Sequence, residues 1–406
     1  MKTIITKSIL SFAVIVGLSL SVYATEPLQV ATSPAAEKEW TFLLFLNGHN
    51  NLSSYGDMNL KDMEKSGSTD QVNYVVEWGK TGDKVNRRLR VEKSKDPSKV
   101  TSPTVMSLNN VDMGDYKNLI EFIRWGVKTY PAKHYFIAVW NHGSGWKKLA
   151  LDEQMHSRDI SYDDNTGNKI TTEQLGLALA EAKQIIGRNV DIYGSDACLM
   201  QMAEVAAQFK DSVDYMSGSQ ETEPGQGWPY APFMQKWAAH PTYTPAEVTS
   251  LLSKEYLAAY NGGVYGRQSV TFSSMDLSKM DALISSTKAL AAHLKSLGND
   301  SLKKIRTEVG NVTNFYYEDY ADFGDFVKRI DAMPAIQHDS KLFSQVAADI
   351  KSVVVTTDNS NSFSGATGVS IWAPTFATSD MSRYSGLEFS KLTGWDSFLQ
   401  AMLAAK

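Results

Sequence analysis

The feature that most constrains the fold is a series of short, uninterrupted apolar runs. The run Phe42-Leu43-Leu44-Phe45-Leu46 contains no polar residue, and such a run is typical of a strand that is covered on both faces. Similar runs recur along the first half of the chain and alternate with stretches of helical periodicity. Buried strands separated by helices predict an α/β fold with a mostly parallel sheet and helices on both faces.

The expected elements can be given as residue ranges. We expect strands at 41–46, 72–78, 87–91, 134–140, 190–193 and 213–217. We expect helices at 60–65, 116–130, 170–186 and 199–209. The helix at 116–130 has apolar residues at the i, i+3, i+4, i+8 spacing of one buried face. At the start of the helix at 170–186, Thr171 and Gln174 are placed like a capping box.

The pattern changes after about residue 230. Long helical stretches at 245–260, 279–297 and 342–355 are interrupted by only two strand-like runs, at 269–273 and 369–372. We therefore expect an α/β core at 39–275. Residues 276–406 should form a helical C-terminal part that packs on this core and returns one strand, 369–372.

The first 24 residues have the pattern of an export signal. Lys2 and Lys7 supply a positive start, residues 9–20 an apolar stretch, and Val22-Tyr23-Ala24 a small-residue cleavage pattern. The apolar stretch is short for a membrane span, although a membrane anchor is the alternative. We expect removal of residues 1–24, a flexible lead-in at 25–38 and a secreted or periplasmic protein without a membrane anchor.

Charge and cysteine content narrow the function further. A net charge of −5 gives no reason to expect binding to nucleic acid. The single cysteine, Cys198, excludes an intrachain disulfide. A free thiol in an exported protein is exposed to oxidants, so its presence suggests a use. The alternative is a buried cysteine that acts as a small hydrophobic residue.

Two short motifs each follow an expected strand. Asn141-His142-Gly143-Ser144-Gly145-Trp146 follows the strand at 134–140, and Ser195-Asp196-Ala197-Cys198-Leu199-Met200 follows the strand at 190–193. Ligands bind outside the carboxyl ends of parallel strands. We therefore expect His142 and Cys198 to meet and to form the dyad of a cysteine protease.

The neighbours of the two residues suggest how the dyad would work. Cys198 is expected to lie just before the helix at 199–209, whose positive end would favour the thiolate. We predict that the N–H groups of Gly143 and Cys198 form the oxyanion hole. His142 could instead be a structural histidine at a strand end, and His49, in the turn after the first strand, is its only rival.

Asp196 lies two residues before Cys198. At that spacing its carboxylate can point into the pocket for the substrate side chain that precedes the cut bond, where it would pair with Arg or Lys. The alternative is that Asp196 caps the following helix. Spacing alone does not decide between the two roles.

The chain resembles the clostripain family of cysteine peptidases, in the caspase-like clan. The matching segments run from Leu46 to Pro374, and their order and joint presence are specific. They are Asn50-Asn51-Leu52, the Asn141 to Trp146 motif, Tyr162-Asp163-Asp164 with Leu175 downstream, Asp196-Ala197-Cys198, Glu221 to Trp228, Tyr320-Ala321-Asp322-Phe323 and Gly368-Val369-Ser370-Ile371-Trp372.

The resemblance implies a caspase-like α/β/α sandwich and endopeptidase activity after Arg or Lys on protein or peptide substrates. It also implies a dyad of His142 and Cys198, with Asp196 as the selector of basic side chains. Family members often carry an acid where this chain has Gln226, so we expect Gln226 in the substrate pocket and weaker binding of a basic side chain. In the turn after the first strand, His49 stands where the family often has Asp.

The family also suggests how the enzyme is regulated. Members are often activated by cleavage between the His and Cys strands, where this chain has Lys147, Lys148 and Arg158. Each of these could equally be an ordinary solvated loop charge. Some members respond to calcium, but the acidic residues in this interval lack the spacing of a calcium loop. We expect a monomer with no required metal or cofactor.

Two other functions remain open at this point. One is a protease of the same clan that cleaves after Asn or Asp. The other is an exported binding protein that kept the fold and lost catalysis, although such a protein need not keep both His142 and Cys198. A metal hydrolase is poorly supported, because no two histidines stand at ligand spacing.

Overall fold

The computed structural model describes residues 36–94, 96–147, 159–334 and 339–406. These residues belong to one compact unit, Ala35–Lys406. The expected export signal and most of the lead-in lie outside the described residues. Within them, no helix combines the length and apolar character that a membrane span needs.

The main sheet has nine strands, in the order β12-β10-β7-β6-β5-β1-β2-β3-β4. Their bounds are β1 Lys38–Gly48, β2 Val72–Lys80, β3 Val85–Arg90, β4 Thr104–Asn109, β5 Ala132–Trp140, β6 Val190–Asp196, β7 Val213–Gly218, β10 Thr271–Asp276 and β12 Val354–Asn359. The five strands from β7 to β2 pair in parallel. The two strands at each end are antiparallel to their neighbours. The predicted mostly parallel sheet is confirmed.

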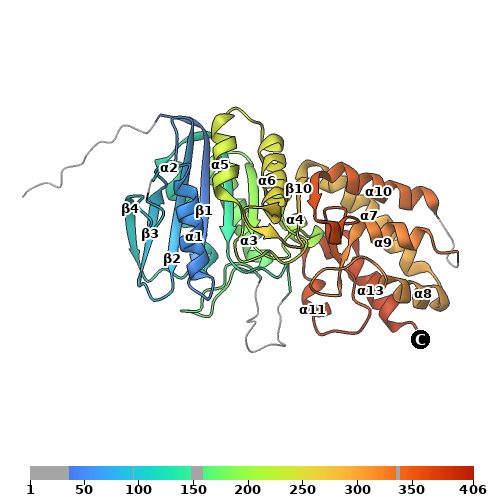
Figure 1. The fold of residues 1–406 in the computed structure, drawn as a ribbon. Helices are drawn as coiled ribbons and strands as arrows, with labels where there is room; N and C mark the ends of the chain where they lie inside the picture. Colours follow the sequence, from blue (N-terminus) through green and yellow to red (C-terminus); the bar gives the residue numbers. More distant parts are fainter. Residues whose placement is uncertain (1–35, 95, 148–158, 335–338) are drawn as a thin grey trace, which may run out of the picture. The chain divides into compact units, whose positions relative to one another are not determined.

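Helices cover both faces of this sheet (Figure 1). One face carries α1 Ser53–Glu64, α5 Tyr230–Ala239 and α6 Pro245–Tyr260, and the other carries α2 Tyr116–Thr129, α3 Thr172–Ile186 and α4 Ala203–Phe209. Strand β1 shows why both faces are needed. Its residues Phe42 and Leu44 pack in one core and Leu43 and Phe45 in the other, and all four are fully buried. This alternation explains the apolar run in the sequence.

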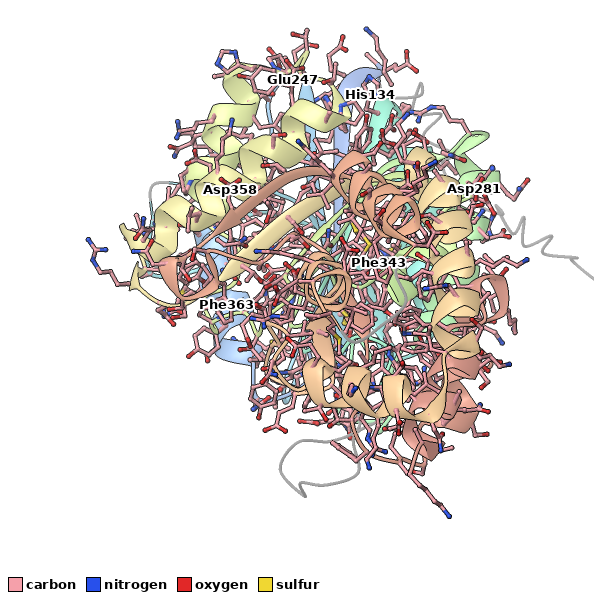
Figure 2. The ribbon with its side chains drawn as sticks, turned by 90° about the vertical axis from the view of Figure 1, so that its right-hand side faces the viewer. His134, Glu247, Asp281, Phe343, Asp358 and Phe363 are labelled. Atoms are coloured by element: carbon pink, nitrogen blue, oxygen red, sulfur yellow. The ribbon has the colours of Figure 1, made fainter. Side chains whose placement is uncertain are left out.

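The C-terminal part is mainly helical. It contains α7 Met280–Ser296, α8 Asn299–Val309, α9 Phe323–Asp331, α10 Ser340–Val353, α11 Met381–Tyr384, α12 Glu388–Thr393 and α13 Trp395–Ala404. Figure 2 looks onto this part and labels Phe343 of α10 and Asp281 of α7, two helices that pack on one another. Phe343 is buried in the same core as the helices α2, α3 and α4.

The strands of the C-terminal part differ from the prediction. The expected strand at 369–372 is β13, Ser370–Trp372, but it pairs with β11, Tyr320–Asp322, in a separate two-stranded sheet. The strand that joins the main sheet is β12, part of which was predicted to be helical. Four consecutive β-branched residues, 354–357, explain why the helix α10 gives way to a strand there. A further short hairpin, β8 Asn261–Gly263 and β9 Gly266–Arg267, follows α6.

Candidate active site

The register of two neighbouring strands brings the His and Cys motifs together. Strands β5 and β6 pair in parallel, with Trp140 opposite Asp196. The N–H of Asn141 donates to the carbonyl oxygen of Asp196 at 3.2 Å, so the backbone pairing continues one residue beyond the end of β5. His142 and Cys198 each lie two residues beyond this pair, and both line one cavity of about 230 Å³.

Gly143 packs directly against the backbone of the Cys motif. A Cβ atom added to Gly143 would lie 2.4 Å from the carbonyl oxygen of Cys198 and 3.1 Å from the Cβ of Ala197. No larger residue can therefore stand at this position without displacing the Cys motif. The β-bridge between Gly143 and Ile160 takes its hydrogen bond from the N–H of Ser144, so it does not use the Gly143 N–H. The two predicted oxyanion donors thus come from adjacent segments.

The surroundings of Cys198 differ from those expected. Leu199 has a positive φ of 63°, which turns the chain away from a helical path. Helix α4 begins only at Ala203, so its positive end does not directly follow the thiol as predicted. Instead, the Glu223 N–H donates to the sulfur, and its nitrogen lies 3.3 Å from Cys198 Sγ. A backbone N–H that points at the sulfur favours its thiolate form.

The His142 ring is held by a residue that the sequence analysis did not single out. Its Nε2 lies 2.7 Å from Oδ1 of Asn51, in the loop between β1 and α1. The rival, His49, is 3% exposed, and its Nδ1 lies 2.7 Å from Oδ2 of Asp163. His49 does not line the cavity that holds Cys198.

Asp196 lies in the wall of the cavity next to the thiol. Its Oδ2 accepts hydrogen bonds from the Tyr230 hydroxyl at 2.6 Å and from the Trp228 N–H at 3.3 Å. Burial raises the pKa of this carboxyl to about 6. The alternative role as a helix cap does not apply, because the N-cap of α4 is Met202.

Glu223 supplies a second carboxyl group that the sequence analysis missed. It lines the same cavity, and both of its carboxyl oxygens are shielded from solvent without a well-formed hydrogen bond among the described residues. Burial and the charge of Asp196 raise the pKa of Glu223 well above its ordinary value. Two neighbouring buried carboxyl groups share their protons rather than ionise fully.

Gln226, which was predicted to line the substrate pocket, is not among the residues around the cavity. The N–H of Gly227 bonds back to the carbonyl oxygen of Pro224, and Gly227 has a positive φ of 63°. In this turn the carbonyl oxygen of Gln226 accepts a hydrogen bond from the Asn59 side chain at 2.8 Å. The residues of this segment that line the cavity are Glu223, Pro224, Gly225 and Gly227.

Of the three predicted self-cleavage residues, the structure describes only Lys147. Its side chain is 9% exposed, and its ammonium group pairs with Asp319 and lies 3.5 Å from Asp380. Arg383 pairs with Asp159, the first described residue after the gap. Lys147 is thus buried and engaged, which makes it poorly suited to enter a protease active site. Lys148 and Arg158 lie outside the described residues.

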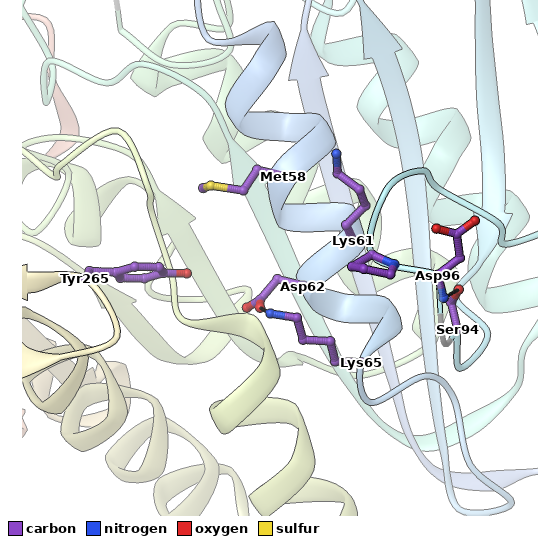
Figure 3. A pocket seen from close by; sticks show the side chains of 8 residues that line it. Met58, Lys61, Asp62, Lys65, Ser94, Asp96 and Tyr265 are labelled. Atoms are coloured by element: carbon purple, nitrogen blue, oxygen red, sulfur yellow. Dashed lines mark hydrogen bonds and ion pairs between the residues drawn. The ribbon is translucent and has the colours of Figure 1, made fainter.

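A larger hollow, of about 430 Å³, lies beside α1 (Figure 3). Its two lysines pair with carboxylates of α1: Lys65 with Asp62 at 2.9 Å and Lys61 with Asp57 at 2.7 Å. It contains neither a thiol nor an imidazole. Among the residues that the structure describes, no cluster of three or more His, Cys, Asp or Glu could hold a metal ion.

The chain matches known proteins over most of its length. A sequence model described as the clostripain family matches residues 44–400. Clostripain from Hathewaya histolytica is 25% identical over 304 residues, which cover 65% of this chain and 57% of that protein. The chain thus spans little more than half the length of this curated relative.

The solved structures that resemble the fold include two C11 proteases. One is a secreted C11 cysteine protease from Bacteroides thetaiotaomicron in complex with an irreversible peptide inhibitor, with a TM-score of 0.68 and 20% identity over 88% of this chain and 99% of the other. The other is an inactive zymogen C11 protease from Parabacteroides distasonis, with a TM-score of 0.67 and 19% identity over 88% and 98% of the two chains. At such identities these likenesses show a shared fold.

Proposed function

Because this chain belongs to the clostripain family, we propose that it is a cysteine endopeptidase that cleaves after Arg or Lys. The observation that carries the proposal is the β5–β6 register, which puts His142 and Cys198 on one cavity with two buried carboxyl groups. A nucleophile, a base and a pocket for a cation are the parts that such a reaction needs.

The reaction follows from the placement of these groups. The Cys198 thiolate attacks the carbonyl carbon of the scissile bond, while His142 holds the thiol proton. The N–H groups of Gly143 and Cys198 stabilise the oxyanion. His142 gives its proton to the leaving amine as the C–N bond breaks, which leaves a thioester on Cys198. Water, activated by the neutral imidazole, then hydrolyses the thioester and restores the thiol.

The cavity suits a cationic side chain better than a neutral or acidic one. Asp196 and Glu223 place two carboxyl groups beside the thiol. A guanidinium group can bind carboxylates in bidentate fashion, and an ammonium group can bind as a point charge. An acidic side chain in the same place would be repelled by the negative charge that this carboxyl pair keeps. We therefore propose specificity for Arg or Lys before the cut bond, although the second carboxyl group comes from Glu223 and not from position 226.

The remaining parts of the proposal concern processing and location. Export with removal of residues 1–24, and self-cleavage after Lys148 or Arg158, fit the resemblance and the basic residues in the sequence. The buried ion pair of Lys147 argues against cleavage after that residue. We propose a secreted or periplasmic monomer that acts on proteins or peptides and requires no cofactor, calcium included.

The test is hydrolysis of matched peptides that carry Arg, Lys, Asn or Asp before the cut bond, by the wild type and by Cys198→Ala. We expect cleavage after Arg and Lys, and none by the variant. Cleavage after Asn or Asp would contradict the pocket. If neither protein cleaves any peptide, and a denaturing gel shows that the chain has been processed, the binding-protein alternative is favoured.

A further inference from the structure

The loop that follows β1 reaches across the strand ends to the His142 ring. Asn51 Oδ1 lies 2.7 Å from His142 Nε2, although the two residues are 91 positions apart. Asn51 is exposed, and its neighbour Leu52 lines the cavity. An exposed hydrogen bond of this kind contributes little to folding stability, on the order of 1 kcal/mol or less. Its position on the imidazole calls for another explanation.

The backbone that presents Asn51 is held in place by its neighbour, Asn50. Asn50 is 2% exposed. Its Oδ1 accepts the N–H of Leu52 at 2.9 Å, and its Nδ2 donates to the carbonyl oxygen of Tyr162 at 2.9 Å. The Thr81 hydroxyl donates to the backbone oxygen of Asn50 at 2.9 Å. These bonds hold the loop that places Asn51 beside His142. A residue that orients another side chain needs such a fixed backbone.

The chemistry of an amide oxygen determines which ring nitrogen carries the proton. A carbonyl oxygen can only accept, so the partner nitrogen Nε2 must carry a hydrogen. This leaves Nδ1 to take the proton from the Cys198 thiol and to pass it to the leaving amine. In the thiolate–imidazolium state both ring nitrogens are donors, and an acceptor at Nε2 stabilises that state.

We propose that Asn51 is a positioning residue of the dyad, which fixes the orientation and tautomer of His142. The inference rests on the proposed function of His142 and Cys198. The titratable groups that line the cavity with His142 are Cys198, Asp196 and Glu223, so two carboxyl groups are already present. Asn51 supplies an acceptor without adding a third. A further carboxylate would hold the proton on the imidazole more strongly and slow its transfer to the leaving group.

Kinetics of Asn51 variants test the role. Asn51→Ala should lower kcat for an Arg peptide by about 10- to 100-fold and leave KM nearly unchanged. Without the acceptor the imidazolium loses its proton more easily, so the alkaline limb of the pH profile should move to lower pH. Asn51→Asp should move this limb to higher pH. Asn109→Ala, an exposed change on the edge strand β4, is the control and should match the wild type.

A second measurement does not need turnover. In protein labelled with 15N-histidine, long-range proton–nitrogen correlations report the tautomer of each ring, and His142→Gln identifies the signal. At a pH where the His142 ring is neutral, we expect the Nε2–H tautomer in the wild type and a mixture in Asn51→Ala. An Nδ1–H tautomer in the wild type, or unchanged kcat and pH profile in Asn51→Ala, would overturn the inference. If the wild type is inactive on every peptide, the proposed function fails, while the tautomer still decides the role of Asn51.

Discussion

Replacing Asp196 with asparagine tests the proposed pocket, because the change removes a charge and almost no volume. Tyr230 and Trp228 both donate to one oxygen of Asp196, and the asparagine carbonyl can keep an acceptor there. Asp196 is 4% exposed, so a bound cation would face it in a buried setting. Removing one partner of a buried ion pair costs about 3–5 kcal/mol.

The second carboxyl group in the cavity limits this loss. Glu223 stays beside the cation in the Asp196→Asn variant, so we expect the lower end of the range, about 3 kcal/mol. At about 1.4 kcal/mol for each factor of ten, kcat/KM for an Arg peptide should fall about 100-fold. Replacing both residues, with Glu223→Gln added, should lower it further.

The assay compares two peptides that differ only in the residue before the cut bond, arginine or the neutral isostere citrulline. The ratio of their kcat/KM values isolates the charge interaction from any effect on the thiol. Alkylation of Cys198 by iodoacetamide checks that the nucleophile is intact. An equal loss on both peptides would refute the pocket and show that Asp196 acts on the dyad instead.

Three further predictions follow from other features of the site. Burial raises the pKa of Asp196 to about 6, so this carboxyl group is neutral below that pH and charged above it. The value of kcat/KM for the Arg peptide should therefore fall below about pH 6. The citrulline peptide should not show this fall. Gly143→Ala should lower kcat by about 100-fold or more, because the new Cβ would press on the Cys198 carbonyl and displace an oxyanion donor. Lys147→Met should lower the free energy of unfolding in urea by about 3–5 kcal/mol, because Asp319 then stays buried without this cationic partner.

Matched variants separate these effects from nonspecific damage. Gly298→Ala adds a Cβ where nothing lies within 4 Å, and it should keep full activity. Lys65→Met removes an ion pair whose lysine is 60% exposed, and it should change stability by less than about 1 kcal/mol. If Lys147→Met unfolds like Lys65→Met, the buried pair does not stabilise the fold. If Gly143→Ala keeps kcat, other groups bind the oxyanion.

The central sheet could be predicted from the sequence because burial on both faces leaves a direct pattern of apolar runs. The family and the mostly parallel sheet expected from these runs and motifs are confirmed. Two boundaries were wrong for local reasons. Leu199 adopts a positive φ, which leucine rarely does, so nothing in the sequence marked the delay before α4. Strand β12 was hidden because its first two residues also continue the apolar pattern of α10.

Only some residues of the candidate site could be predicted from the sequence. His142, Cys198 and Asp196 follow predicted strands, so their meeting could be expected from the sheet alone. Glu223 reaches the thiol from a loop 25 positions away, and Asn51 reaches the imidazole from a loop 91 positions away. Such contacts depend on how loops fold over the sheet, which strand periodicity does not encode. Gln226 does not line the cavity, although Pro224, Gly225 and Gly227 of the same turn do, and such a difference within one turn leaves no sequence pattern.

The pairing of Trp140 with Asp196 has a consequence for how such a protein can change over time. The spacing of the two reactive residues is carried by main-chain hydrogen bonds between neighbouring strands, and these bonds are available to almost any sequence. Substitutions in the two cores can therefore accumulate without moving the imidazole away from the thiol, as long as neither strand gains or loses a residue. Insertions and deletions, rather than substitutions, are the changes that this arrangement cannot absorb, and chains that share about a fifth of their residues can keep the same fold.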